Sequence, residues 1–199
     1  MLTALVLLCT MGTTDCRMIA ESPDQSELPF MCLTYGMEEA AKHPVPDGKF
    51  VKSWGKIGVH HGEFRTPHAL AFDSKGRLWV ADRGNHRIEI FDQNGTYLES
   101  RYMYGRISGI FIKGNTVYAI DSESGPYNHS NWRDGVRIGP VDEDRVTGFI
   151  PPFERGDRVY QGAAGEGVAV DADGNVYAAE GPNSLAQAGG AFTKYSVGR

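Results

Sequence analysis

The sequence predicts an all-β fold built from repeated small sheets, and three observations support this. Three segments share a short apolar strand, a glycine-containing turn and a second strand that ends in a carboxylate, namely 69–82, 109–121 and 167–180. The first two closing carboxylates, Asp82 and Asp121, lie 39 residues apart, and about 40 residues make one four-stranded propeller blade. The apolar runs are short and have no helical period. The chain is therefore predicted to be a β-propeller with about three blades of four antiparallel strands.

The first element, residues 1–45, is predicted to be a divergent segment, and the blades are predicted to occupy 46–199. The segment holds all three cysteines and shows no regular alternation of apolar and polar residues. Its opening run, MLTALVLLCTMG, is signal-like in length but lacks a positively charged start and a clear cleavage site. It could equally form a strand or part of a blade. Localisation stays open between a secreted or periplasmic protein and a cytoplasmic one.

Charge and cysteine content restrict the partners and sites of the chain. It has 20 Lys and Arg against 25 Asp and Glu, a net charge of −5, and shows no basic cluster. Because nucleic-acid binding needs such a cluster, no nucleic-acid partner is expected. No apolar run is long enough for a membrane-spanning helix. The blades contain no cysteine, so they hold no thiolate metal site.

The first blade carries a specific motif. It contains G-x-F-x-x-P at Gly62, Phe64 and Pro67, A-x-D-x-x-G-x-x-x-V-A-D from Ala71 to Asp82, and N-x-R-I from Asn85 to Ile88. This segment strongly resembles an NHL repeat, and the two later units resemble weaker copies that lack N-x-R-I. The run from about Phe50 to Val197 resembles the C-terminal half of a six-bladed propeller. It is similar to the bacterial peptidyl-α-hydroxyglycine α-amidating lyase family.

The resemblance implies a zinc ion in a central channel. In the family, three histidines from alternate blades hold the ion, each just before an innermost strand. His68 matches one of them, and the equivalent positions in the next two units are Ser108 and Glu166. Glutamate is a competent zinc ligand, so His68 and Glu166 are expected to bind metal. Calcium, which lactonase-type propellers hold in the same channel, is the alternative ion. Without a metal, His68 would hydrogen-bond loop backbone and Glu166 would be a solvated rim carboxylate.

Further residues are assigned to catalysis and substrate binding. The run Tyr35–Phe50 resembles the family's D-G-Y-x-N-x-R-I…F-x-P-D-G-K-F sequence, which makes Tyr35 the implied catalytic tyrosine. His61 precedes the first blade in a loop expected to lead to the channel mouth. Trp132 and Arg133 lie in an insertion that could cover a ligand. These three are the substrate-binding candidates, and each could equally be an exposed loop residue.

A structural role is expected for the residues that recur in register. A carboxylate at the end of each second strand can accept backbone N–H groups of the following loop. Neighbouring polar residues of the first unit would share this role. The residues assigned to it are Asp82, Asn85, Arg87, Asp121 and Glu180.

Three blades do not close a propeller ring, so two apolar blade faces would be left exposed. Self-association of two copies would close the ring. The chain could otherwise be a fragment, or residues 1–45 could supply a further blade. Three functions remain open. The first is a metal-dependent lyase of the amidating type acting on a small peptide or small molecule, and the second is a non-catalytic NHL scaffold that binds a protein or peptide. The third is a lactonase-like hydrolase with calcium in the channel.

Overall fold

The computed structural model describes residues 5–9, 16–21, 50–153, 164–179 and 192–196. The chain divides into two compact units, Met1–Lys52 and Ser53–Arg199. In the first unit, β1 (Leu5–Cys9) pairs antiparallel with β2 (Cys16–Glu21). The predicted boundary between residues 45 and 46, the candidate Tyr35 and the candidate Glu180 all lie outside the described residues.

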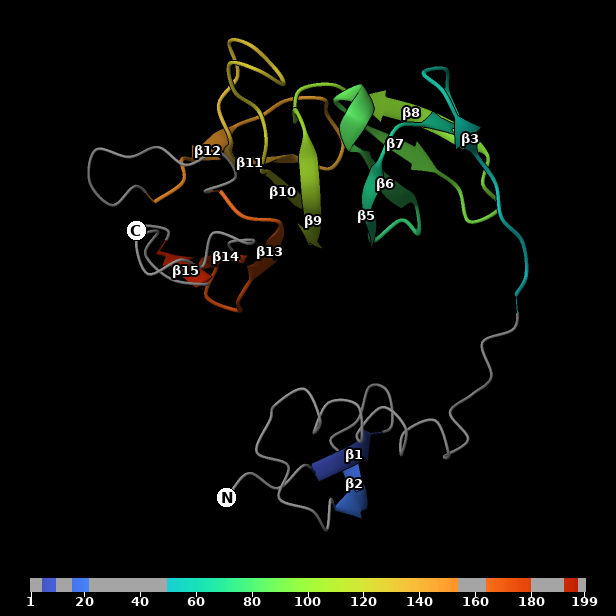
Figure 1. Ribbon diagram of the computed structural model, residues 1–199, viewed down its shortest axis with the longest axis vertical. Helices are drawn as coiled ribbons and strands as arrows, with labels where there is room; N and C mark the ends of the chain where they lie inside the picture. The colour runs from blue at the N-terminus through green and yellow to red at the C-terminus, as the bar shows by residue number, and fades with distance from the viewer. Residues whose placement is uncertain (1–4, 10–15, 22–49, 154–163, 180–191, 197–199) are drawn as a thin grey trace. The chain divides into compact units, whose positions relative to one another are not determined.

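The second unit contains three antiparallel sheets, called blades, in which consecutive strands are neighbours (Figure 1). Blade 1 contains β5 (Pro67–Phe72), β6 (Leu78–Asp82), β7 (Arg87–Phe91) and β8 (Tyr97–Arg101). Blade 2 contains β9 (Ile107–Lys113), β10 (Thr116–Asp121), β11 (Gly135–Pro140) and β12 (Gly148–Ile150). Blade 3 contains β13 (Gly167–Val170), β14 (Val176–Ala179) and β15 (Phe192–Tyr195). The predicted all-β, bladed fold is confirmed, and three strands of blade 3 fall within the described residues.

Two minor elements complete the described part of this unit. A short parallel pair, β3 (Lys56–Ile57) with β4 (Glu63–Phe64), precedes blade 1. A 3-10 turn, η1 (Arg83–Asn85), connects β6 to β7. Within the described ranges, no helix is long and apolar enough to cross a membrane.

The hairpins between the first two strands of blades 1 and 3 are built alike. Asp73 Oδ1 accepts the backbone N–H of Lys75 at 2.9 Å and of Arg77 at 3.0 Å. In blade 3, Asp171 Oδ1 accepts the N–H of Asn175 at 2.8 Å. Gly76 and Gly174, with φ of 73° and 91°, adopt the left-handed conformation that such turns require. The shared aspartate and glycine therefore explain why the same sequence pattern makes a hairpin twice.

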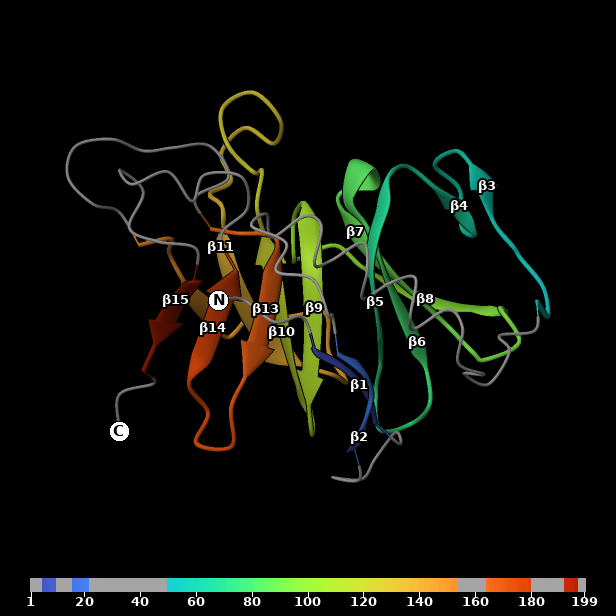
Figure 2. The same cartoon turned by 60° about the horizontal axis from the view of Figure 1, so that its bottom comes forward.

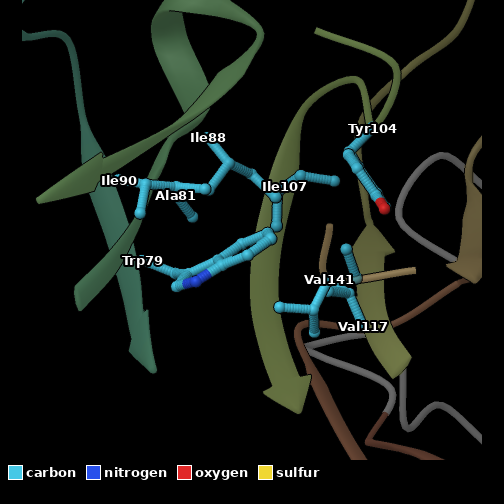
Figure 3. Close-up of a cluster of buried hydrophobic side chains, with 9 residues drawn as sticks. Trp79, Ala81, Ile88, Ile90, Tyr104, Ile107, Val117 and Val141 are labelled. Carbon is cyan, nitrogen blue, oxygen red and sulfur yellow. The ribbon is translucent and has the colours of Figure 1, made fainter. Parts of the chain in front are cut away.

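Two apolar clusters join the blades. The first lies between blades 1 and 2 and includes Trp79, Ala81, Ile88 and Ile90 from blade 1 with Ile107, Val117 and Ala119 from blade 2 (Figure 3). The second lies between blades 2 and 3 and includes Ile120, Val136, Val170, Val176 and Ala178. Alternate residues of a strand point to opposite faces of its sheet, so blade 2, the middle blade, contributes to both interfaces.

The first strand of each blade lies beside the first strand of the next, β5 beside β9 and β9 beside β13 (Figure 2). The starts of these three innermost strands consequently lie close together. Residues at and just before these starts are the candidates for a shared site.

Candidate metal and substrate site at the innermost strands

His68 and Ser108 occupy equivalent irregularities at the starts of β5 and β9. In blade 1, Pro67 pairs with Asp82 and Ala69 pairs with Ala81, so His68 is left without a partner across the sheet. In blade 2, the register shifts in the same way around Ser108. A bulge re-aims the side chain of its extra residue. His68 and Ser108 are therefore the extra residues of equivalent bulges in blades 1 and 2.

The structure brings His68, Ser108 and Glu166 together. His68 Nδ1 lies 2.8 Å from the backbone oxygen of Ser108. His68 Nε2 lies 3.2 Å from Oε2 of Glu166, with side-chain exposures of 30% and 40%. Glu166 is fixed just before β13, where its backbone N–H donates to the oxygen of Ala179 at 2.8 Å. The three residues that occupy equivalent positions in the three repeats therefore lie next to one another.

Hydrogen-bond chemistry limits what His68 can do there. A carbonyl oxygen only accepts, so Nδ1 must carry a proton and donate to Ser108. A neutral imidazole then has a lone pair on Nε2, facing a carboxylate that is also an acceptor. The arrangement is favourable if the ring is an imidazolium or if a cation lies between Nε2 and Glu166. An Nδ1–H bonded to a backbone carbonyl is also the usual support of a metal-binding histidine.

Arg83 is a residue of this site that the sequence pattern did not indicate. It lies in η1, and its side chain is 14% exposed. Its Nη1 is 3.3 Å from Ser108 Oγ, 3.4 Å from Glu123 Oε1 and 3.9 Å from Glu166 Oε1. The arginine therefore contacts residues that belong to blades 2 and 3. Its position directly after Asp82, the closing carboxylate of the first repeat, could have indicated that Arg83 lies at this site.

Glu123 holds two arginines beside the site. Its Oε2 accepts from Arg106 Nη2 at 2.6 Å, while Oε1 faces Arg83. Burial by itself raises the pKa of Glu123, but the hydrogen bond from Arg106 and the charge of Arg83 outweigh it and lower the pKa below its ordinary value. Glu123 is thus ionised at neutral pH, and it neutralises part of the positive charge at the strand starts.

Trp132 takes part in a row of ring contacts with two histidines. The His129 and Trp132 rings are stacked with centroids 4.5 Å apart, and the His86 ring lies 4.4 Å from that of His129. The Arg137 guanidinium lies 4.8 Å from the centre of the Trp132 ring. Arg133 is exposed, and its backbone oxygen accepts from Arg137 Nη2 at 2.6 Å. Of the two substrate-binding candidates in this connection, Trp132 is held in place by packing and Arg133 faces solvent.

His61 lies with the outer strands rather than beside His68. Its Nδ1 is 3.2 Å from Oε1 of the fully buried Glu89 in β7, and its ring stacks on Tyr97 of β8 with centroids 4.1 Å apart. Gly62 N also donates to Glu89 at 3.0 Å. The loop that was expected to lead to the channel mouth therefore packs against the outer part of blade 1.

The recurrent polar residues form buried networks. Asp82 Oδ1 accepts the N–H of Arg65 at 2.7 Å, which belongs to the preceding segment rather than to the following loop. Asp82 Oδ2 accepts from Asn85 at 2.7 Å and from Arg87 at 2.9 Å. Arg87 also donates to backbone oxygens of Val59, His60 and Glu63. These contacts tie the segment before blade 1 to its middle strands.

Blade 2 contains a counterpart of the Asp82–Arg87 pair. Asp121 Oδ2 accepts from Arg137 Nη1 at 2.8 Å, and its Oδ1 accepts the N–H of Ser124 at 2.8 Å in the following loop. In the sequence, Arg137 and Ile138 supply the R-I of the motif, separated from Asp121 by the long connection 122–134. Blade 2 is therefore a closer copy of blade 1 than its sequence indicates.

The donors at the strand starts are compatible with zinc, although they are few. Across the described ranges, no group of three or more His, Cys, Asp and Glu could hold a metal ion. His68 and Glu166 supply two donor atoms. Zinc–ligand distances of about 2.0–2.2 Å separate neighbouring tetrahedral ligands by roughly 3.3–3.6 Å. The observed 3.2 Å between Nε2 and Oε2 is close to this range.

Comparisons with known proteins agree with the repeated architecture. The family model for the NHL repeat matches residues 64–91. The chain is 50% identical over 40 residues to NHL repeat-containing protein 3 of Homo sapiens, covering 20% of this chain and 12% of that protein. It is 30% identical over 142 residues to peptidyl-glycine alpha-amidating monooxygenase B of Xenopus laevis, covering 66% of this chain and 15% of that protein. It is 39% identical over 61 residues to protein lin-41 of Caenorhabditis elegans, covering 31% of this chain and 5% of that protein. The predicted NHL-repeat propeller is thereby confirmed, and the chain spans a small part of the length of each relative.

Proposed function

We propose that this NHL-repeat β-propeller chain belongs to a metal-dependent lyase of the amidating type, with His68 and Glu166 as metal ligands. The observation that carries the proposal is the position of His68. One of its ring nitrogens is fixed by a backbone carbonyl and the other faces a carboxylate at 3.2 Å. The similarity to an amidating monooxygenase over 142 residues supports an enzyme of the amidating type.

The donor set favours zinc over calcium. An imidazole nitrogen is a common zinc ligand, whereas calcium takes oxygen ligands. A bound zinc ion would act as a Lewis acid that polarises a substrate hydroxyl or carbonyl oxygen. The ligands that complete its coordination would come from residues other than these two.

The residues around the pair have distinct roles in this proposal. The Ser108 carbonyl keeps the proton of His68 on Nδ1 and leaves Nε2 available. Arg83, which contacts Glu166 at 3.9 Å, can donate to a substrate carboxylate, since guanidinium–carboxylate bonds are strong and directional. We assign the removal of a substrate proton to Tyr35 by resemblance, and contact with the rest of the substrate to Trp132 and Arg133. His61 pairs with Glu89 at the outer strands of blade 1, so we assign it no direct contact with the reacting part of the substrate.

Metal content tests the proposal. The 199-residue chain should be purified from zinc-supplemented medium and analysed by inductively coupled plasma mass spectrometry. We expect zinc in the wild-type protein and at least tenfold weaker zinc affinity in His68→Ala and Glu166→Gln. His60→Ala is the matched control, because His60 is an exposed histidine of the same chain and should retain zinc. A zinc-free wild type, or equal affinity in all four proteins, would refute the metal site.

The alternative is a non-catalytic scaffold that binds a protein or peptide. It is supported by the matches over 40 and 61 residues to proteins whose printed names describe no lyase, NHL repeat-containing protein 3 and protein lin-41. A peptidyl-α-hydroxyglycine substrate separates the two functions. Zinc-dependent turnover that is lost in His68→Ala supports the lyase, whereas zinc-independent peptide binding without turnover supports the scaffold.

A further inference from the structure

Equivalent positions in the three blades face equivalent directions. We call the face that packs on the next blade the trailing face and the opposite face the leading face. Trp79 lies on the trailing face of blade 1, fully buried against blade 2, and its Nε1 donates to Asp73 at 3.0 Å. Tyr177 is its equivalent in blade 3, and its hydroxyl donates to Asp171 at the same distance, 3.0 Å. Blade 3 is therefore built to present a trailing face as blade 1 does.

The trailing face of blade 3 packs against no blade among the described residues. The strand register places Tyr177 on the same face as Ala169, and Ala179 on the same face as Phe192. Ala169 is exposed and the Phe192 side chain is 78% exposed. The opposite face of the same blade is buried against blade 2 through Val170, Val176 and Ala178.

The leading face of blade 1 is apolar and is open along β5, whereas Leu78 and Val80 of β6, on the same face, are buried with Phe64 packed against them. Leu70 and Phe72 of β5 are 66% and 60% exposed. Their equivalents in blades 2 and 3, which include Ile110 and Val168, pack in the clusters between blades. A groove of about 620 Å³ follows this face and is lined by Trp54, Phe64, His68, Leu70, Leu78 and Val80.

We propose that a second copy of this chain covers both faces, with the leading face of blade 1 packed on the trailing face of blade 3 of its partner. The chain already makes this kind of contact twice, from blade 1 to blade 2 and from blade 2 to blade 3. One second copy offers a complementary face for each of these two exposed faces. Two identical junctions related by a two-fold axis then close the assembly, which limits it to two copies.

This assembly does not depend on the proposed metal site, because the contacts are made by strand residues such as Leu70, Ala169 and Phe192 and not by the His68–Glu166 pair. It does affect that site, since His68 lines the groove at the junction. The assembly would hold two His68–Glu166 pairs, one from each copy. Zinc content and oligomeric state are separate measurements, so the failure of one proposal is distinguishable from the failure of the other.

Light scattering coupled to size-exclusion chromatography tests the assembly on the 199-residue chain. We expect twice the chain mass of 21.8 kDa in the wild type. Leu70→Glu and Ala169→Glu each place a charge in both junctions and should raise the dissociation constant at least 100-fold. Tyr127→Glu is the control, because Tyr127 is 91% exposed in the connection between β10 and β11 and should leave the dimer intact. Far-UV circular dichroism confirms folding, and Phe72→Ser serves as a second leading-face variant if Leu70→Glu does not fold.

Mixing the two charge variants tests which faces meet. A mixed pair keeps one junction free of introduced charge, so the mixture should associate more tightly than either variant alone. An equal affinity in the mixture and the single variants would overturn the proposed face pairing. A wild type that is monomeric at 100 µM would overturn the dimer itself. A mass that continues to grow with concentration would overturn the closed, two-copy arrangement.

Discussion

Arg87 shows how single side chains hold blade 1 together. It is 4% exposed and lies within 3.3 Å of the carboxylates of Asp82 and Glu89, both fully buried. It also donates to three backbone oxygens of the segment 59–63. A buried carboxylate that loses its cation is costly, so this residue has a structural role that its charge alone would not reveal.

Replacing Arg87 should therefore destabilise the fold strongly. We expect Arg87→Met to lower the free energy of unfolding by about 3–5 kcal/mol, because both carboxylates would be left buried without their partner. Urea unfolding followed by tryptophan fluorescence measures the change. Arg145→Met is the control: its pair with Glu143 is exposed on both sides, so it should cost less than about 1 kcal/mol. Similar losses in the two variants would contradict this role of Arg87.

His86 and His129 should make stability depend on pH. Burial lowers the pKa of both residues, with a further contribution from Arg106 for His86 and from His86 for His129. The folded state thus favours the neutral rings. In the unfolded chain the two histidines have the ordinary histidine pKa of about 6.5, so below that pH they bind protons more readily than in the fold. Their contribution to stability is therefore fully present above pH 6.5 and decreases as the pH falls from there.

Urea midpoints at pH 7.5 and pH 5.5 test this dependence. The double variant His86→Gln, His129→Gln should lose less stability between these pH values than the wild type. His60→Gln, which changes an exposed histidine, should behave as the wild type does. An unchanged pH dependence in the double variant would show that other groups cause it.

At the scale of single elements, β6 carries the interface between blades 1 and 2. Trp79 is fully buried in that interface, and its indole N–H is bonded to Asp73. Trp79→Ala should lower the free energy of unfolding by about 3–5 kcal/mol, the usual cost of such a truncation in a core. Leu98→Ala, at a side chain that is 45% exposed in β8, should cost much less. A small effect at Trp79 would show that the two blades unfold independently.

The elements were predictable from the sequence because their signals are local. Alternation along a strand and a glycine-containing turn need no knowledge of distant residues, and they located the hairpins that end at Asp82 and Asp121. The long connection 122–134 hid the equivalence of Arg137 and Arg87, because motif spacing assumes a short turn. The hydrogen bond between Arg137 and Asp121 restores that equivalence.

At the scale of the whole molecule, the arrangement of blades explains which parts of the site were predictable. His68 and Glu166 were found because each occupies the same place in a repeat. Arg83 and Glu123 were not, since they form contacts across blades that no spacing rule describes. His61 was placed at the channel mouth by its position in the chain, but its partner is the fully buried Glu89, and position in the chain does not indicate that contact.

The hydrogen bond from His68 to the oxygen of Ser108 has a consequence for how this chain tolerates change. Since the acceptor belongs to the main chain, every residue type at position 108 would present the same oxygen. The tautomer of the imidazole is thus determined by the backbone position of β9 and not by the identity of a side chain. Substitutions at position 108 can alter the polarity beside the histidine while its protonated nitrogen stays where it is, and a comparison of side chains at this position would not reveal the constraint.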